Sequence, residues 1–207
     1  MNRFIVVVGV LLVTGCATST VTYTPPSVGP VDNSKSVSVP FDQLWDRLVK
    51  NLASDFFVIN NIEKNSRIIN VSFSAQQPSK YVDCGRTYRT FKNARGEQSY
   101  SYESADSSSY SLAYGNGAFN VQRGTRLEGR TNIYVAPEGN GSVVTVNTKY
   151  VLNIDITAVP LGGGFPSKQS VIADFSTKTP YSNTVGNDTI VCKATGTIER
   201  QILKMAD

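Results

Sequence analysis

The chain offers few side chains for acid–base or nucleophilic chemistry. Its 207 residues include no histidine, which excludes Ser–His and Cys–His nucleophile pairs and removes the usual ligand of a catalytic zinc ion. The Gly-x-Ser-x-Gly and Ser-x-x-Lys patterns of serine-dependent enzymes are absent as well. The three cysteines and the 16 acidic residues are therefore the groups whose placement decides which chemistry is open to the chain.

The acidic residues keep one class of enzyme open, because a glycosidase needs only two carboxylates. Asp155 and Asp174 lie within apolar runs, whereas the other acids lie in turns, on the polar side of a helix or on polar strand positions. A carboxylate-based cell-wall hydrolase is thus a remote alternative. The sequence favours a protein that is not an enzyme and that uses no cofactor or metal ion.

Cys16 follows a short apolar segment at the N-terminus. Arg3 supplies a positive charge, and residues 4–13 are uncharged and almost wholly apolar. This run has about half the length that a membrane-spanning helix needs, so residues 1–15 are predicted to be a signal peptide. The stretch Val13-Thr14-Gly15-Cys16 is similar to the lipobox of bacterial lipoproteins.

This resemblance implies that Cys16 is a membrane anchor, because lipobox cysteines carry a diacylglyceryl thioether and an acylated amino group. Each buried methylene contributes about 0.8 kcal/mol, so two or three acyl chains hold a protein on a membrane stably. The next residue is Ala17 and not aspartate. By the sorting rule of enteric bacteria, this implies the outer membrane of a Gram-negative bacterium, with the domain facing the periplasm. The alternative is an ordinary secretory signal with an unrelated cysteine.

Two cysteines, Cys84 and Cys192, remain after Cys16. In an oxidising periplasm this even remainder favours a disulfide, and free thiols are the alternative. Closing a loop of about 100 residues restricts the unfolded chain by about 4 to 5 kcal/mol. No Cys-x-x-Cys motif is present, and two cysteines without histidine leave a tetrahedral metal ion without enough ligands.

Residues 16–39 are rich in Ser, Thr, Pro and Gly and lack apolar periodicity. Such a segment buries too little surface to offset the entropy of ordering it. It is predicted to be a lipidated, disordered tether that keeps the folded part near the membrane but free of it. Residues 40–207 are then a single domain.

The domain begins with a predicted helix after Pro40, followed by several predicted strands. Apolar residues fall on one face of that helix at Phe41, Leu44, Trp45, Leu48, Val49 and Leu52. Strand patterns occupy residues 56–62, 69–73, 127–135, 144–154, 171–175 and 189–194, and a short helix begins near Thr197. This order predicts an α+β fold, in which a curved antiparallel sheet is covered by an N-terminal and a short C-terminal helix.

Residues 80–117 combine basic, aromatic and serine-rich stretches. Tyr and Arg are enriched at protein interfaces, and Ser adds adaptable hydrogen bonding. The candidate partner-binding residues are Tyr81, Arg86, Tyr88, Arg89, Tyr100 and Tyr102. A mobile, partly paired loop whose tyrosines cover a sheet edge is the other interpretation. Such a composition also suits single-stranded nucleic acid, but a lipid-anchored protein outside the cytoplasm rarely meets it, so we expect no nucleic-acid partner.

The segment from Phe41 to Phe73 combines the pattern Phe-x-x-Leu-Trp-x-x-Leu with two apolar strands and a short turn. It resembles the start of the helix-grip domains in BamC-type lipoproteins of the outer-membrane β-barrel assembly machinery. The resemblance implies a helix-grip-like fold and carries over no functional residue. The chain differs from that family in having one such domain, two cysteines suited to a disulfide, and the Ser/Tyr-rich stretch.

The sequence therefore predicts a lipid-anchored lipoprotein of the cell envelope. We expect it to act as a non-enzymatic protein-binding or assembly module for another envelope protein. The alternative function is a carrier for lipid or another small apolar ligand, with a pocket between the first helix and the sheet.

Overall fold

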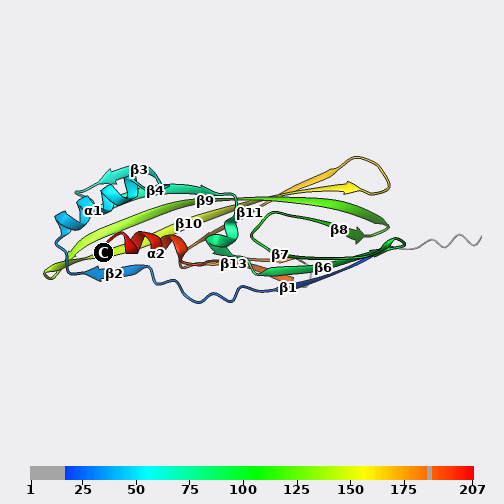
Figure 1. Ribbon diagram of the computed structural model, residues 1–207, viewed down its shortest axis with the longest axis horizontal. Coiled ribbons are helices and arrows are strands. Elements are labelled where there is room, and N and C mark those ends of the chain that lie inside the picture. The colour runs from blue at the N-terminus through cyan, green and yellow to red at the C-terminus, as the bar shows by residue number, and fades with distance from the viewer. Residues whose placement is uncertain (1–16, 186–187) are drawn as a thin grey trace, which may run out of the picture.

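One long antiparallel hairpin runs the length of the molecule (Figure 1). Its strands, β9 (Gly117–Glu138) and β10 (Gly141–Pro160), pair from Gly141↔Glu138 to Pro160↔Phe119. At about 3.3 Å per residue, the 20 residues of β10 extend over about 65 Å. The computed structural model describes residues 17–185 and 188–207. The hairpin makes the fold elongated, and the other elements pack along it.

Each strand of the hairpin has two partners along its outer edge. β8 (Ser108–Tyr114) and β4 (Ile68–Ala75) pair with successive parts of β9, and β3 (Val58–Glu63) pairs with β4. β11 (Ser167–Ser176) and β2 (Ser34–Val37) pair with successive parts of β10. These strands form a seven-stranded antiparallel sheet.

Two smaller sheets complete the β-structure. In one sheet β6 lies between β1 and β7; in the other β13 lies between β12 and β5. Their strands are β1 (Thr18–Thr24), β6 (Arg86–Asn93), β7 (Gly96–Glu103), β5 (Val82–Asp83), β12 (Tyr181–Val185) and β13 (Asp188–Ala194). A short 3₁₀ helix, η1 (Pro78–Lys80), precedes β5.

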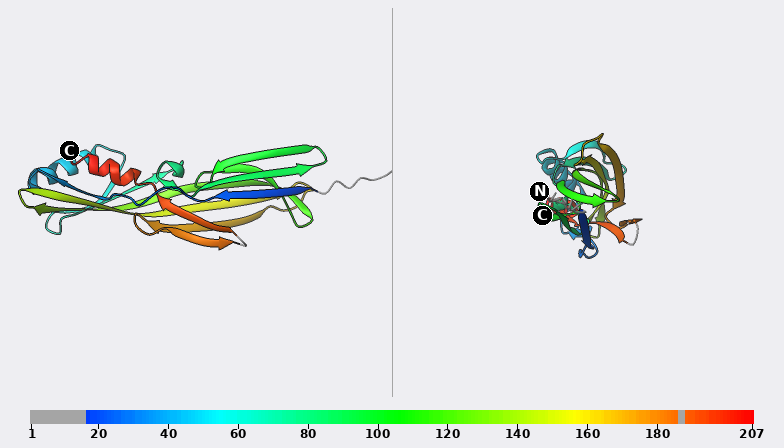
Figure 2. Two further views of the ribbon diagram at one scale, coloured as in Figure 1. Left: turned by 90° about the horizontal axis from the view of Figure 1, so that it is seen from below. Right: turned by 90° about the vertical axis from the view of Figure 1, so that its right-hand side faces the viewer.

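Both helices cover the same end of the long sheet (Figure 2). α1 (Phe41–Ala53) buries Leu44, Leu48 and Leu52 completely, and α2 (Thr197–Lys204) buries Ile198 and Ile202. Trp45 lies in this core, as its place in the apolar stripe predicts. The other half of the molecule contains no helix among its described residues. There the β1–β6–β7 sheet faces the long sheet as a second layer (Figure 1).

The α+β class and the antiparallel sheet are confirmed, and each predicted helix or strand pattern overlaps an observed element. The long hairpin extends beyond both of its predicted ends. α2 begins at Thr197, with Gly196 and not Thr197 at the N-cap position. Among the described residues, no helix is long and apolar enough to cross a bilayer.

The prediction of a disordered tether is wrong for residues 17–39. β1 pairs with β6 from Thr18↔Lys92 to Thr24↔Arg86, and β2 pairs with β10. Between them, the Asn33 amide donates to the Val146 carbonyl at 2.9 Å. The composition of β1 and β2 does not indicate that they are ordered. They are held by backbone hydrogen bonds to strands far along the chain and bury few apolar side chains of their own. Cys16 and the predicted signal peptide lie outside the described residues.

The interpretation of residues 80–117 as a mobile loop is also wrong. The stretch forms β5, β6, β7 and β8, which belong to three different sheets. Its serines and tyrosines alternate along β7, so polar and aromatic side chains point to opposite faces.

Candidate functional site

A cavity of about 310 Å³ lies between the two layers in the half of the molecule that contains β1. Its lining includes polar and aromatic side chains, among them Arg89, Tyr102, Tyr110 and Arg123. The aliphatic side chains Ile154, Ile156, Val171 and Ile190 line it as well, and Ile156 pairs with Arg123 across β9 and β10. The volume lies at the lower end of the range typical of small-molecule sites.

Strand alternation places the polar residues in the cavity. In β6, Thr87 and Arg89 point inward, and Arg86 and Tyr88 point outward. The register Thr87↔Tyr102 puts Tyr102 of β7 on the same inner face. Arg123 of β9 comes from the opposite layer, so two guanidinium groups from different sheets line one cavity.

Arg123 is held by backbone carbonyls. Its Nη1 donates to the carbonyl of Asp106, and its Nη2 donates to the carbonyl of Ser104, each at 2.5 Å. Burial lowers the pKa of the Arg123 guanidinium from its ordinary value, and the nearby Tyr102 and Tyr110 oppose that shift. The geometry fixes this cation in place while leaving its charge without a carboxylate in the cavity lining.

Arg89 is positioned by the two tyrosines. Its Nε donates to the Tyr102 hydroxyl at 3.0 Å, and its guanidinium lies 4.6 Å from the centre of the Tyr110 ring. The Tyr102 and Tyr110 rings stack with centroids 5.6 Å apart. Burial raises the pKa of Tyr110, which keeps its phenol neutral beside the cation. Arg89 is thus oriented by a hydrogen bond and a cation–π contact.

The lining of this cavity contains no acid, although the charge of Asp106, outside the lining, acts on Arg123. The ion pairs between side chains of the described residues involve other cations, and neither Arg89 nor Arg123 takes part in one. Two cations beside aliphatic side chains favour a ligand that combines an anionic group with an apolar body.

The six predicted partner-binding residues do not form one surface. Arg89 and Tyr102 line the cavity, and the Tyr100 ring approaches the Tyr110 ring edge-on, with centroids 6.3 Å apart. Arg86 and Tyr88 are exposed on the outer face, where Arg86 pairs with Glu103 at 3.2 Å. Tyr81 packs against Phe73 in the other half, with centroids 5.5 Å apart.

Arg123 and Tyr110 are not among the candidate residues that the sequence predicts. A signal for Arg123 was present, because the alternation of the predicted strand at Leu127 continues backwards through Thr125, Arg123 and Val121. All four face inward in β9. Tyr110 alternates with serines and is followed by Leu112 and Tyr114 at every second position, a pattern that favours a strand. The pairing of β8 with β9 is what places Tyr110 beside Val121 and Arg123.

The pocket expected between the first helix and the sheet is filled. Leu44 and Leu48 of α1 pack there with Val135, Val144 and other fully buried side chains. The cavity lies instead in the half that the helices do not cover.

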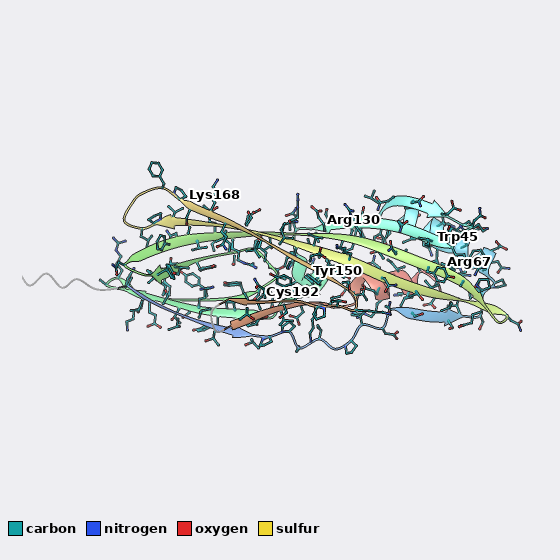
Figure 3. All side chains as sticks on the ribbon, turned by 180° about the vertical axis from the view of Figure 1, so that it is seen from behind. Trp45, Arg67, Arg130, Tyr150, Lys168 and Cys192 are labelled. Atoms are coloured by element: carbon teal, nitrogen blue, oxygen red, sulfur yellow. A yellow bond between two sulfur atoms is a disulfide. The ribbon has the colours of Figure 1, made fainter. Side chains whose placement is uncertain are left out.

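Cys84 and Cys192 form the expected disulfide. Cys84 follows β5, and Cys192 lies in β13, which pairs with β5 through Lys193↔Asp83 and Ala194↔Val82. Both cysteines are buried in the core, and Figure 3 labels Cys192. The bond joins segments that are 108 residues apart in the chain.

The acids embedded in apolar runs are not buried. The Ser170 hydroxyl donates to Asp155 at 2.5 Å, and Lys149 pairs with Asp174 at 2.9 Å on the exposed face. Glu199 of α2 is fully buried, and it accepts hydrogen bonds from the hydroxyls of Tyr150 and Thr177. Across residues 17–185 and 188–207, no group of three or more Cys, Asp or Glu residues is placed to hold a metal ion.

Comparison with protein-family models, with curated proteins and with solved structures finds no match to this chain. Its function is therefore inferred from its own residues.

Proposed function

We propose that this chain is a lipoprotein of the bacterial cell envelope, anchored through Cys16, that binds a small anionic amphiphile in its cavity without transforming it. The observation that carries the ligand class is the pair Arg89 and Arg123, which share a cavity with aliphatic side chains and with no carboxylate in its lining. The protein acts on the periplasmic side of the outer membrane and uses no cofactor, metal ion or nucleic acid.

Binding is tested by titrating the purified full-length protein with decanoate and with decanol, which has the same chain and no charge. We expect decanoate to bind more tightly. Arg89→Gln weakens decanoate binding by about tenfold, the loss expected when one charge-assisted hydrogen bond is removed. Arg126→Gln is the matched control, because Arg126 lies on the outer face of β9 and pairs with Glu128.

Ile156→Trp adds a second test, since the indole fills the cavity from β10. We expect it to abolish decanoate binding while the protein remains folded by circular dichroism. Undiminished binding by this variant, or equal binding of decanoate and decanol by the wild type, would overturn the ligand proposal. Native mass spectrometry of protein extracted from membranes provides the natural ligand's mass.

The anchor is tested separately through Cys16. We expect Cys16→Ser to release the protein from membranes while the domain still folds, because no acyl chain is attached. The mass of the mature N-terminus reports acylation directly. An unmodified cysteine on membrane-extracted wild type would overturn the anchor.

A protein-binding module is the second candidate, favoured by the outer face of the β1–β6–β7 sheet. Arg86 and Tyr88 lie there, and Tyr88 is 46% exposed. A crosslinked pull-down of an envelope protein that fails with Tyr88→Ala but persists with Arg89→Gln would support this face. A helix-grip-like arrangement is proposed only for the half where α1 and α2 cover the sheet.

A further inference from the structure

The fold begins almost at Cys16. Thr18 already pairs with Lys92, so the anchor residue lies only two positions before the first strand. Two extended residues span about 7 Å at most. A lipid on Cys16 therefore holds this end of the molecule against the bilayer, where a disordered tether would have left the domain free.

Several turns lie at the same end as the start of β1. The Ser19 hydroxyl accepts from the Ala113 amide at 2.8 Å, which places the end of β8 beside β1. The Leu161 amide donates to the Ala118 carbonyl at 2.8 Å, which places the end of β10 beside the start of β9. Figures 1 and 2 show the β8–β9 and β10–β11 connections at this end and both helices at the other.

These turns expose apolar side chains. Phe165 is 97% exposed and Tyr114 is 79% exposed, the two highest values among the large hydrophobic residues of the described chain. Leu161, in the same connection as Phe165, is also exposed. The basic residues Arg95 and Lys168 are exposed beside them, and Figure 3 shows Lys168 next to the β10–β11 connection.

We propose that this end of the molecule is a membrane-contacting face, at which Phe165, Leu161 and Tyr114 enter the interface of the bilayer that holds Cys16. The proposal rests on the proposed anchor at Cys16. Aromatic side chains prefer the boundary between headgroups and acyl chains, and nearby Arg and Lys are attracted to anionic headgroups. The lipid on Cys16 attaches the protein to the bilayer. The apolar turns orient it, so that the long axis of the molecule points away from the bilayer.

The test places an indole at the proposed contact. Acylated full-length protein carrying Phe165→Trp is reconstituted into vesicles of phosphatidylethanolamine and phosphatidylglycerol that contain brominated lipid. The control is Tyr134→Trp, because Tyr134 is exposed on β9 near the far end of the hairpin, where it pairs with Thr145. The native Trp45 is 4% exposed and contributes the same background to both variants.

We expect brominated lipid to quench the Phe165→Trp variant strongly and the Tyr134→Trp variant no more than the wild type. Equal quenching of the two variants in attached, acylated protein overturns the membrane face and leaves the anchor standing. A mature N-terminus without acyl chains overturns the anchor, and the membrane face with it.

A second measurement uses protein that lacks the lipid anchor but retains the proposed membrane-contacting face. Vesicle association of Cys16→Ser protein is expected to fall by about tenfold when Phe165→Ser and Leu161→Ser are added, because two apolar side chains leave the interface. Adding Val58→Ser and Ile62→Ser, which alter exposed positions on β3, is expected to change nothing. An equal effect of both pairs contradicts the proposal.

Discussion

At the scale of single residues, the direction of each side chain decides what it can do. Tyr88 and Arg89 are neighbours in β6, yet one faces solvent and the other lines the cavity. Composition identified the Tyr/Arg-rich stretch, but it could not divide the inward from the outward residues, because that division depends on strand register. Glu199 is the clearest case: it lies in a polar helix sequence and is fully buried.

Tyr150→Phe tests the buried pair of Tyr150 and Glu199. The Tyr150 hydroxyl lies 3.0 Å from one oxygen of Glu199 and 3.1 Å from the other. Removing it leaves a buried carboxylate with one donor fewer, so we expect a loss of about 1 to 3 kcal/mol in the free energy of unfolding. Urea denaturation measures this loss. Tyr134→Phe, on the exposed face, is expected to change stability by less than about 0.5 kcal/mol.

The pair of Tyr150 and Glu199 also predicts that the free energy of unfolding depends on pH. Burial, and then the charge of Glu199, raise the pKa of Tyr150 well above its ordinary value of 10.0. The unfolded chain therefore releases this proton at a lower pH than the folded chain does. The stabilisation that comes from keeping Tyr150 protonated in the folded chain is fully present below pH 10, and it is lost progressively as the pH rises above that value. Urea midpoints between pH 8 and about 11 should fall less steeply for Tyr150→Phe than for the wild type; parallel curves would contradict this assignment.

At the scale of elements, the sequence predicts those whose apolar faces are continuous. α1, α2 and the centre of the β9–β10 hairpin follow from periodicity, because each buries a regular stripe. β1, β2 and β6–β8 were not predicted as strands. Their order comes from pairing with partners far along the chain, such as Tyr23↔Thr87, and polar alternation alone does not reveal that pairing. The cavity was missed for the same reason, since these strands form one of its layers.

Gly129→Ala tests how β4 packs against β9. A Cβ at Gly129 would overlap the ring of Phe73, a core residue of β4. We expect the substitution to cost about 1 to 3 kcal/mol, because the ring must leave its packed position. Gly124→Ala is the matched control on the same strand, where the nearest atom is the Asp155 carbonyl oxygen at 4.0 Å. Thermal unfolding of the two variants should differ clearly, and equal stabilities would contradict the packing.

Removing the Cys84–Cys192 disulfide tests how much this bond between the β5 and β13 segments stabilises the fold. Because the bond spans 108 residues, Cys84→Ser with Cys192→Ser should lower the free energy of unfolding by about 4 to 5 kcal/mol. Urea denaturation of the double variant measures the loss. Alkylation of the unreduced wild type should modify neither cysteine, and modification of both would show that the bond is absent in the native protein.

At the scale of the whole molecule, the two halves differ in structure, and we propose that they differ in function. The half with α1 and α2 contains most of the packed core, including Trp45, Ile133 and Val144. The other half contains the cavity and the proposed membrane face. Ile156 lies four residues before Pro160 at the end of β10, so the cavity is about 13 Å from that end of the hairpin. In the proposed orientation, an amphiphile that leaves the bilayer would meet the cavity close to the membrane surface.

The shape of the molecule gives the last prediction. A compact chain of 207 residues has a radius of gyration of about 17 Å. The β9–β10 hairpin spans the molecule with 20 residues in β10, and a rod of the resulting length has a radius of gyration of about 20 Å. Small-angle X-ray scattering of the unanchored Cys16→Ser protein should give the larger value. A radius of about 17 Å would mean that the two halves fold back on each other, and one end could not then face the membrane while the other extends from it.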